Sequence, residues 1–98
     1  MKDILLLCLC LSLQLQFSAD PITYKLLRLP DNTYGYDIFS RGHILIHQAT
    51  IPGRPGNSGF HRKSDARKIA VLVVAKVKNG IMPPTVTRHE MDSLKVSY

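Results

Sequence analysis

The stretch YGYDIFSRGHILIHQ, residues 34–48, consists of two runs rich in apolar and β-branched residues on either side of Ser40-Arg41-Gly42. Two such runs around a short turn that contains glycine are typical of a β-hairpin. Upstream, ITYKLLRL (22–29) begins with strand-like alternation, and the turn-forming PDNT (30–33) separates it from the hairpin. We therefore expect an antiparallel meander of two or three strands from about residue 22 to 48.

The length of the hairpin loop decides which side chains share a face. A two-residue Arg-Gly turn would leave both faces half polar, whereas a three-residue loop with Gly42 in the left-handed conformation gives one apolar face. The three-residue loop, which we predict, pairs Ile38 with Ile44 and Tyr36 with Ile46. It turns five side chains to the other face: Asp37, Phe39, His43, Leu45 and His47.

The run SDARKIAVLVVAKVKNG, residues 64–80, could be a buried strand or a helix. Its apolar residues recur at helical spacing, which favours the helix. Ser64 is a suitable N-cap, Asp65 suits the first turn, and Asn79-Gly80 suits the end. We expect a helix from residue 64 to 78 that covers the sheet with these side chains: Ala66, Ile69, Ala70, Val73, Val74 and Val77.

The segment IMPPTVTRHEMDSLKV carries a T-x-x-E capping box at Thr87 and Glu90. Val86 and Met91 occupy the two positions of a hydrophobic staple. We therefore predict a short helix from about residue 88 to 95, approached by an extended Pro-Pro segment.

The N-terminal segment, residues 1–19, has an early lysine, an apolar run from Ile4 to Leu13 and a polar exit with small residues. This order predicts a secretory signal peptide, because the run is shorter than the roughly 20 residues of a transmembrane helix. An uncleaved N-terminal anchor is the alternative. Both cysteines lie in this segment, so a processed chain would have no thiol for disulfides, nucleophilic catalysis or metal binding.

Residues 20–98 are expected to form one small domain. The chain has 13 Lys and Arg against 7 Asp and Glu, a net charge of +6, which favours anionic neighbours such as envelope polymers or lipid headgroups. Export argues against nucleic acid as a specific partner.

The loop ATIPGRPGNSGFHRKSDA, residues 49–66, lacks the Lys-Ser/Thr pair of a phosphate-binding P-loop. It also misses the G-x-S-x-G nucleophile motif, because Phe60 replaces the second glycine. We expect a connector whose glycines allow positive φ, with Phe60 as a core anchor. A weaker alternative is an anion site near the start of the helix, formed by Arg54, Asn57, Ser58, His61, Arg62 and Lys63.

His43 and His47 have the H-x-x-x-H spacing of zinc helices, but on a strand this offset separates the side chains by about 13 Å. We expect no metal or cofactor. A pair between Asp37 and one of these histidines is conceivable on the sheet surface. Phe39 and Leu45 beside the histidines would mark a partner surface, unless the C-terminal helix covers that face.

Residues 34–96 resemble a family of short exported Bacteroidetes-type proteins known as a domain of unknown function. The resemblance rests on Tyr34-Gly35-Tyr36, Ile46-His47-Gln48, Ile51-Pro52, Gly56, Gly59-Phe60, the Ala66 and Ala70 spacing, and Pro83-Pro84-Thr85 with Thr87. It implies export, a compact α+β domain and no recognised enzymatic motif, and it transfers no catalytic residue.

The sequence thus predicts an α+β domain with a small antiparallel meander, one main helix and a short C-terminal helix. The predicted function is that of an exported, non-enzymatic envelope binding or accessory protein, with another envelope protein or an anionic envelope component as partner. One alternative is a small enzyme that uses His43 or His47 with Asp37. Another is electrostatic binding of anionic glycan, lipid or nucleic acid through Arg54, His61, Arg62, Lys63, Arg67 and Lys68.

Overall fold

The computed structural model describes residues 21–54 and 56–98, so the expected signal peptide, residues 1–19, lies outside it. The described elements are β2 (Ile22–Arg28), β3 (Tyr34–Ser40), β4 (His43–Gln48), α2 (Lys63–Lys78) and α3 (Arg88–Ser93). The strands form one antiparallel sheet in the order β2-β3-β4, with β3 in the centre. The expected α+β fold with a three-stranded meander is confirmed.

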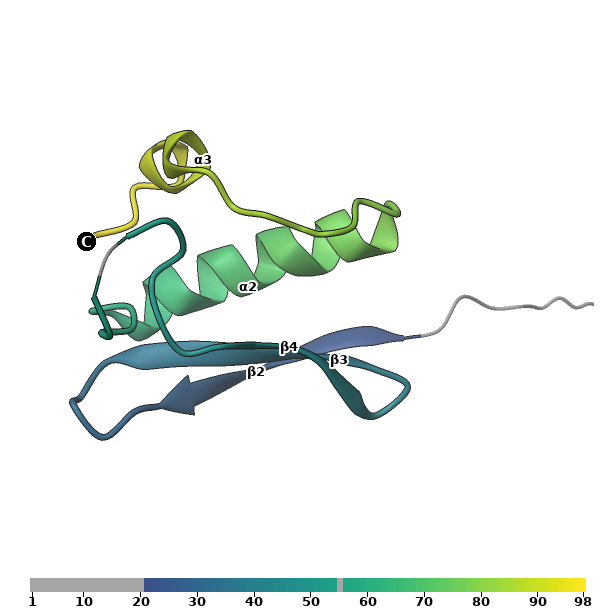
Figure 1. Cartoon of the computed structure of the whole chain (residues 1–98), viewed down its shortest axis with the longest axis horizontal. Coiled ribbons are helices and arrows are strands. Elements are labelled where there is room, and N and C mark those ends of the chain that lie inside the picture. The colour runs from purple at the N-terminus through teal and green to yellow at the C-terminus, as the bar shows by residue number, and fades with distance from the viewer. Residues whose placement is uncertain (1–20, 55) are drawn as a thin grey trace, which may run out of the picture.

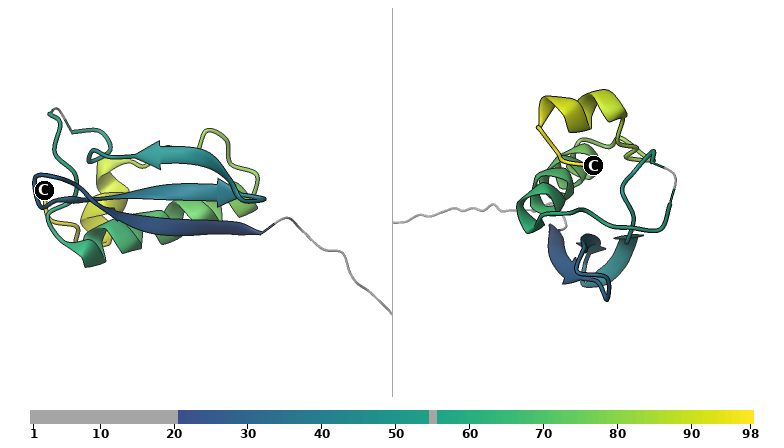
Figure 2. Two further views of the ribbon diagram at one scale, coloured as in Figure 1. Left: turned by 90° about the horizontal axis from the view of Figure 1, so that it is seen from below. Right: turned by 90° about the vertical axis from the view of Figure 1, so that its left-hand side faces the viewer.

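The described elements lie in three layers (Figure 1). Helix α2 packs on one face of the sheet over β2 and β3, and α3 with the segment that precedes it lies on the far side of α2. None of the described residues covers the other face of the sheet (Figures 1 and 2). The alternative that the C-terminal helix covers this face is therefore wrong.

The hairpin between β3 and β4 differs from the predicted register. Arg41 and Gly42 both have positive φ, 53° and 78°, so the turn has two residues rather than three. Ile44 therefore pairs with Phe39 and not, as predicted, with Ile38, and it is 59% exposed. A β-bulge then inserts one extra residue into β4, and Ile38 pairs with Ile46 beyond it.

The bulge explains how a two-residue turn can still build an apolar face. It shifts β4 by one residue, which returns Ile46 to the face that carries Tyr36 and Ile38. These three side chains face α2, and Tyr36 and Ile38 are buried. The prediction of an apolar face was right for these residues and wrong for Ile44.

Helix α2 is confirmed as a helix, but its start differs from the prediction. It begins at Lys63 with Arg62 as N-cap and no side-chain capping bond, so Ser64 is not the cap. Asp65 lies in the first turn as expected and is fully buried. Its carboxylate accepts hydrogen bonds from Arg62 Nε at 3.2 Å and from the backbone N–H of Ser97 at 3.1 Å.

Helix α3 has the predicted capping box: Thr87 Oγ1 accepts from the Glu90 N–H at 3.1 Å, and Glu90 Oε1 accepts from the Thr87 N–H at 2.9 Å. The helix ends at Ser93 rather than Lys95, because Lys95 adopts the left-handed conformation with φ 58°. Met91 is buried in the core between α3 and α2.

Phe60 is fully buried, as predicted for the core anchor of the long loop. Its ring stacks on Tyr36, with centroids 6.3 Å apart, and its backbone forms a bridge with Tyr34. The loop is therefore fastened to the sheet just before α2 begins.

Candidate functional site

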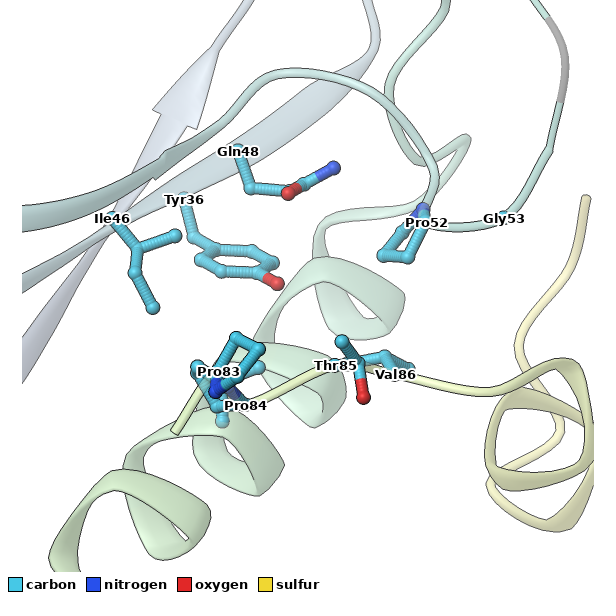
Figure 3. Close-up of a pocket in the computed structure, with 10 residues that line it drawn as sticks. Tyr36, Ile46, Gln48, Pro52, Gly53, Pro83, Pro84, Thr85 and Val86 are labelled. Carbon is cyan, nitrogen blue, oxygen red and sulfur yellow. The ribbon is translucent and has the colours of Figure 1, made fainter. Parts of the chain in front are cut away.

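A hollow with a volume of about 440 Å³ lies between β4, α2 and residues 83–86 (Figure 3). It opens to solvent at Gly53, Pro83 and Thr85, which are exposed. None of the described residues that line it carries a charge. Its apolar wall consists of Ile46, Pro52, Val73, Pro83, Pro84 and Val86.

The sheet register places the hollow. Tyr36 on β3 pairs with Gln48 on β4, and Ile46 follows two residues before it, so all three side chains point to the α2 side. Because α2 packs over β2 and β3, it leaves room beside it above β4. The Pro52 and Pro84 rings border this room from two loops (Figure 3).

The side chain of Tyr36 is the most unusual feature of the hollow. Tyr36 is only 2% exposed, and its hydroxyl points into the space bordered by Pro52, Pro83 and Thr85 (Figure 3). Among the described residues, none forms a hydrogen bond with this hydroxyl. Burial raises the pKa of the Tyr36 phenol, so the group stays protonated and neutral at physiological pH.

Gln48 supplies the second polar group. Its Nε2 donates to the backbone oxygen of Thr50 at 2.5 Å and lies 3.4 Å from Thr50 Oγ1. These contacts fix the orientation of the amide, because a carbonyl oxygen can only accept. No described residue donates to Gln48 Oε1, which is left as a free acceptor beside Tyr36.

The far wall of the hollow is held in place by Lys76 of α2. Its Nζ donates to the backbone oxygen of Thr85 at 2.5 Å and to Glu90 at 2.8 Å. The Lys76 hydrogen bond, aided by the N–H of Thr87, lowers the pKa of Glu90 from its ordinary value. Lys76 therefore ties the wall and the start of α3 to the helix beneath them.

The structure does not bring the residues of the predicted anion site together at one place. Arg54, Ser58 and His61 line a second hollow of about 150 Å³, whereas Lys63 lines a different one beside Arg28. Asn57 is exposed. Arg62 pairs with Asp65, and the buried Asp65 carboxylate already supplies negative charge at the start of α2.

The predicted partner surface on the uncovered face is also divided. Phe39 and His47 belong to it, but the bulge brings Ile44 beside Phe39 in place of Leu45, which is 42% exposed at the bulge. His43 lies at the turn, opposite Ser40.

The conceivable histidine–aspartate pair is present: His47 Nδ1 lies 2.5 Å from Asp37 Oδ1. Asp37 is buried beneath the exposed His47, and neither residue lines any of the hollows above. Across residues 21–54 and 56–98, no cluster of three His, Cys, Asp or Glu side chains could hold a metal ion. In the same part of the chain, no helix is long and apolar enough to cross a bilayer.

Sequence reasoning missed the 440 Å³ hollow altogether. It assigned Tyr36 to the core and took the Pro-Pro pair only as an extended approach to α3. The available signal was a tyrosine on the buried face of a central strand, because a buried phenol hydroxyl normally needs a partner.

Comparison with known proteins gives one result. No curated protein and no solved structure shows a significant match to the chain. The family model of a domain of unknown function, DUF4907, matches residues 29–93, which span β3 to α3 and all residues that line the hollow. The chain therefore belongs to the DUF4907 family.

Proposed function

We propose that this protein is a non-enzymatic binding protein and that the hollow between β4, α2 and residues 83–86 is its binding site. The observation that carries the proposal is the Tyr36 hydroxyl, which has no hydrogen-bond partner among the described residues and points into an apolar hollow that is open to solvent. A hollow of 440 Å³ is within the usual range for ligand sites, about 300–1,000 Å³. A few polar groups in an apolar wall are also typical of such sites.

The chemistry of the lining favours binding over reaction. Apart from Tyr36, whose pKa is raised, none of the described lining residues titrates, and the Thr85 hydroxyl has no histidine or carboxylate beside it in the lining to activate it. Asp37 and His47 lie on the opposite face of the sheet from Tyr36, so their pair cannot act in the hollow. The uncharged wall also gives less support to an electrostatic mode of binding.

The cellular setting of this proposal comes from the sequence. The N-terminal pattern of residues 1–19 supports export, and the net charge of +6 supports work in an envelope rich in anionic components. We propose that the partner is another envelope protein or an envelope component. Membership among Bacteroidetes-type proteins stays a prediction.

Binding of a neutral apolar dye tests the site. We expect N-phenyl-1-naphthylamine to bind the protein saturably with an increase in fluorescence. Thr85→Trp should abolish this binding, because the indole would fill the hollow while the Thr85 backbone oxygen keeps its bond to Lys76.

Ile44→Trp is the matched control, since Ile44 is exposed on the opposite face of the sheet. It should leave dye binding unchanged. Equal effects of the two substitutions, or no saturable binding to the unmodified protein, would refute the proposed site.

A further inference from the structure

We propose that the hollow recognises an uncharged ligand with an apolar body and an amide group, whose C=O accepts a hydrogen bond from Tyr36 and whose N–H donates to Gln48. This inference rests on the proposed function and adds the chemical class of the ligand. Neither the family nor the fold assigns such a class.

The wall requires the ligand to be neutral. All ten lining residues are uncharged, and Val73 on the floor of the hollow is 1% exposed. A carboxylate or ammonium group placed there would lose part of its hydration, and no described lining residue would supply a counter-charge, which is unfavourable. The apolar side chains and proline rings instead favour an apolar body.

Tyr36 requires an acceptor on the ligand. The Tyr36 hydroxyl is accessible in the hollow, so a ligand that covers it must offer an acceptor, because a hydroxyl cut off from water and left unpaired costs free energy. The described part of the protein provides no partner for this hydroxyl, which points into the hollow (Figure 3). A ligand carbonyl oxygen at this position would satisfy it.

Gln48 requires a donor on the same ligand. Its Nε2 is engaged by Thr50, so only Oε1 is available to a bound molecule. Gln48 and Tyr36 are register partners on neighbouring strands, so the two side chains leave the same face of the sheet, and both line the hollow (Figure 3). An amide offers an acceptor and a donor on separate, adjacent atoms, whereas a carboxylate offers acceptors alone.

Matched probes test the class of the ligand by displacement of N-phenyl-1-naphthylamine. The first series is 1-naphthamide, 1-naphthoate and naphthalene, which share one apolar body. We expect 1-naphthamide to bind at least about tenfold more tightly than 1-naphthoate and about fivefold more tightly than naphthalene. N-acetyl-phenylalanine N-methylamide, compared with 1-naphthamide, distinguishes a peptide amide from a free carboxamide.

Two substitutions test the assigned contacts. Tyr36→Phe and Gln48→Met should each weaken 1-naphthamide binding about five- to tenfold and leave naphthalene binding unchanged. The second variant is independent of the first, and circular dichroism shows whether each one folds. If either side chain has a purely structural role, its substitution should weaken the binding of 1-naphthamide and of naphthalene equally.

The outcomes separate this inference from the proposed function. If naphthalene and 1-naphthamide bind equally and Tyr36→Phe changes neither, the amide class is wrong while the binding site stands. Tighter binding of 1-naphthoate would also overturn the inference, in favour of an anionic ligand. If the dye does not bind the protein and none of the probes displaces it, the proposed function fails as well.

Discussion

At the scale of single residues, the Tyr36 hydroxyl should matter for binding rather than for stability. Tyr36 is 2% exposed as a whole, but its hydroxyl reaches the solvent in the hollow, so Tyr36→Phe should change the free energy of unfolding by less than about 1 kcal/mol. Urea unfolding measures this change. Tyr24→Phe, at a tyrosine 36% exposed, is the control and should stay within about 0.5 kcal/mol. A clear loss of stability in Tyr36→Phe would mean that the hydroxyl has a partner within the protein.

Gly59 is required for close packing rather than for its backbone freedom. A Cβ at this position would collide with the carbonyl oxygen of Tyr34 and meet Leu29 Cδ1 at 2.8 Å. Gly59→Ala should therefore push Phe60 away from Tyr34 and destabilise the protein by about 2–4 kcal/mol in urea unfolding. Gly53→Ala, in open space at φ 71°, should cost only about 1 kcal/mol. Equal costs would refute the packing argument.

At the scale of elements, periodicity and capping signals were sufficient to predict a helix wherever its position depends on one local sequence pattern. The spacing of apolar residues identified α2, and the T-x-x-E box identified the start of α3. The β3–β4 register was not predictable in this way, because the two-residue turn and the bulge compensate for one another. Turn preferences depend only on the loop residues, whereas the bulge is favoured because it lets Ile46 pack against α2. The second effect cannot be predicted from the loop sequence.

The capping box of α3 should make stability depend on pH. A depressed carboxyl pKa stabilises the folded state above the unfolded value, near 4.5 for Glu90, and this contribution is lost as pH falls through the lower folded value. Glu90→Gln should therefore destabilise the protein at pH 7, and the difference from the unmodified protein should shrink below about pH 4.5. Urea unfolding from pH 7 to 3 measures it.

Lys76→Met provides the matched test of the cause. It removes the hydrogen bond that contributes most to the lowered pKa of Glu90, so part of the same pH dependence should disappear. If Glu90→Gln instead shifts stability equally at every pH, Glu90 acts only through packing or capping.

At the scale of the whole molecule, the fold was more predictable than the site. Tyr36, Gln48 and the Pro83–Val86 segment meet only because α2 covers two of three strands and leaves β4 beside an empty space. That arrangement depends on the packing angle of α2 and on the path of residues 81–87, which no local pattern contains. The loop cations could be found by composition, yet the structure distributes them around the start of α2.

The outer layer, which consists of α3 and the segments on either side of it (residues 81–98), is held to α2 by hydrogen bonds at both of its ends. At one end Lys76 holds Thr85 and Glu90; at the other, Asp65 accepts from the Ser97 N–H, and Lys68 Nζ donates to the Leu94 oxygen at 2.9 Å. Asp65→Ala would leave the Ser97 N–H without its acceptor and release the C-terminal residues from α2. We expect a loss of about 2–3 kcal/mol in the free energy of unfolding.

Arg62→Ala is the comparison for this prediction, because it removes one of the two hydrogen bonds to the buried Asp65 carboxylate and leaves the acceptor of the Ser97 N–H in place. Hydrogen exchange adds a local readout: the Val96 and Ser97 amides should lose protection in Asp65→Ala and keep it in Arg62→Ala. Binding of N-phenyl-1-naphthylamine should persist in Asp65→Ala, since Lys76 still holds the wall of the hollow from the other end. If this variant folds but no longer binds the dye, the contacts of Asp65 and those of Lys76 do not act independently, and the outer layer moves as one unit.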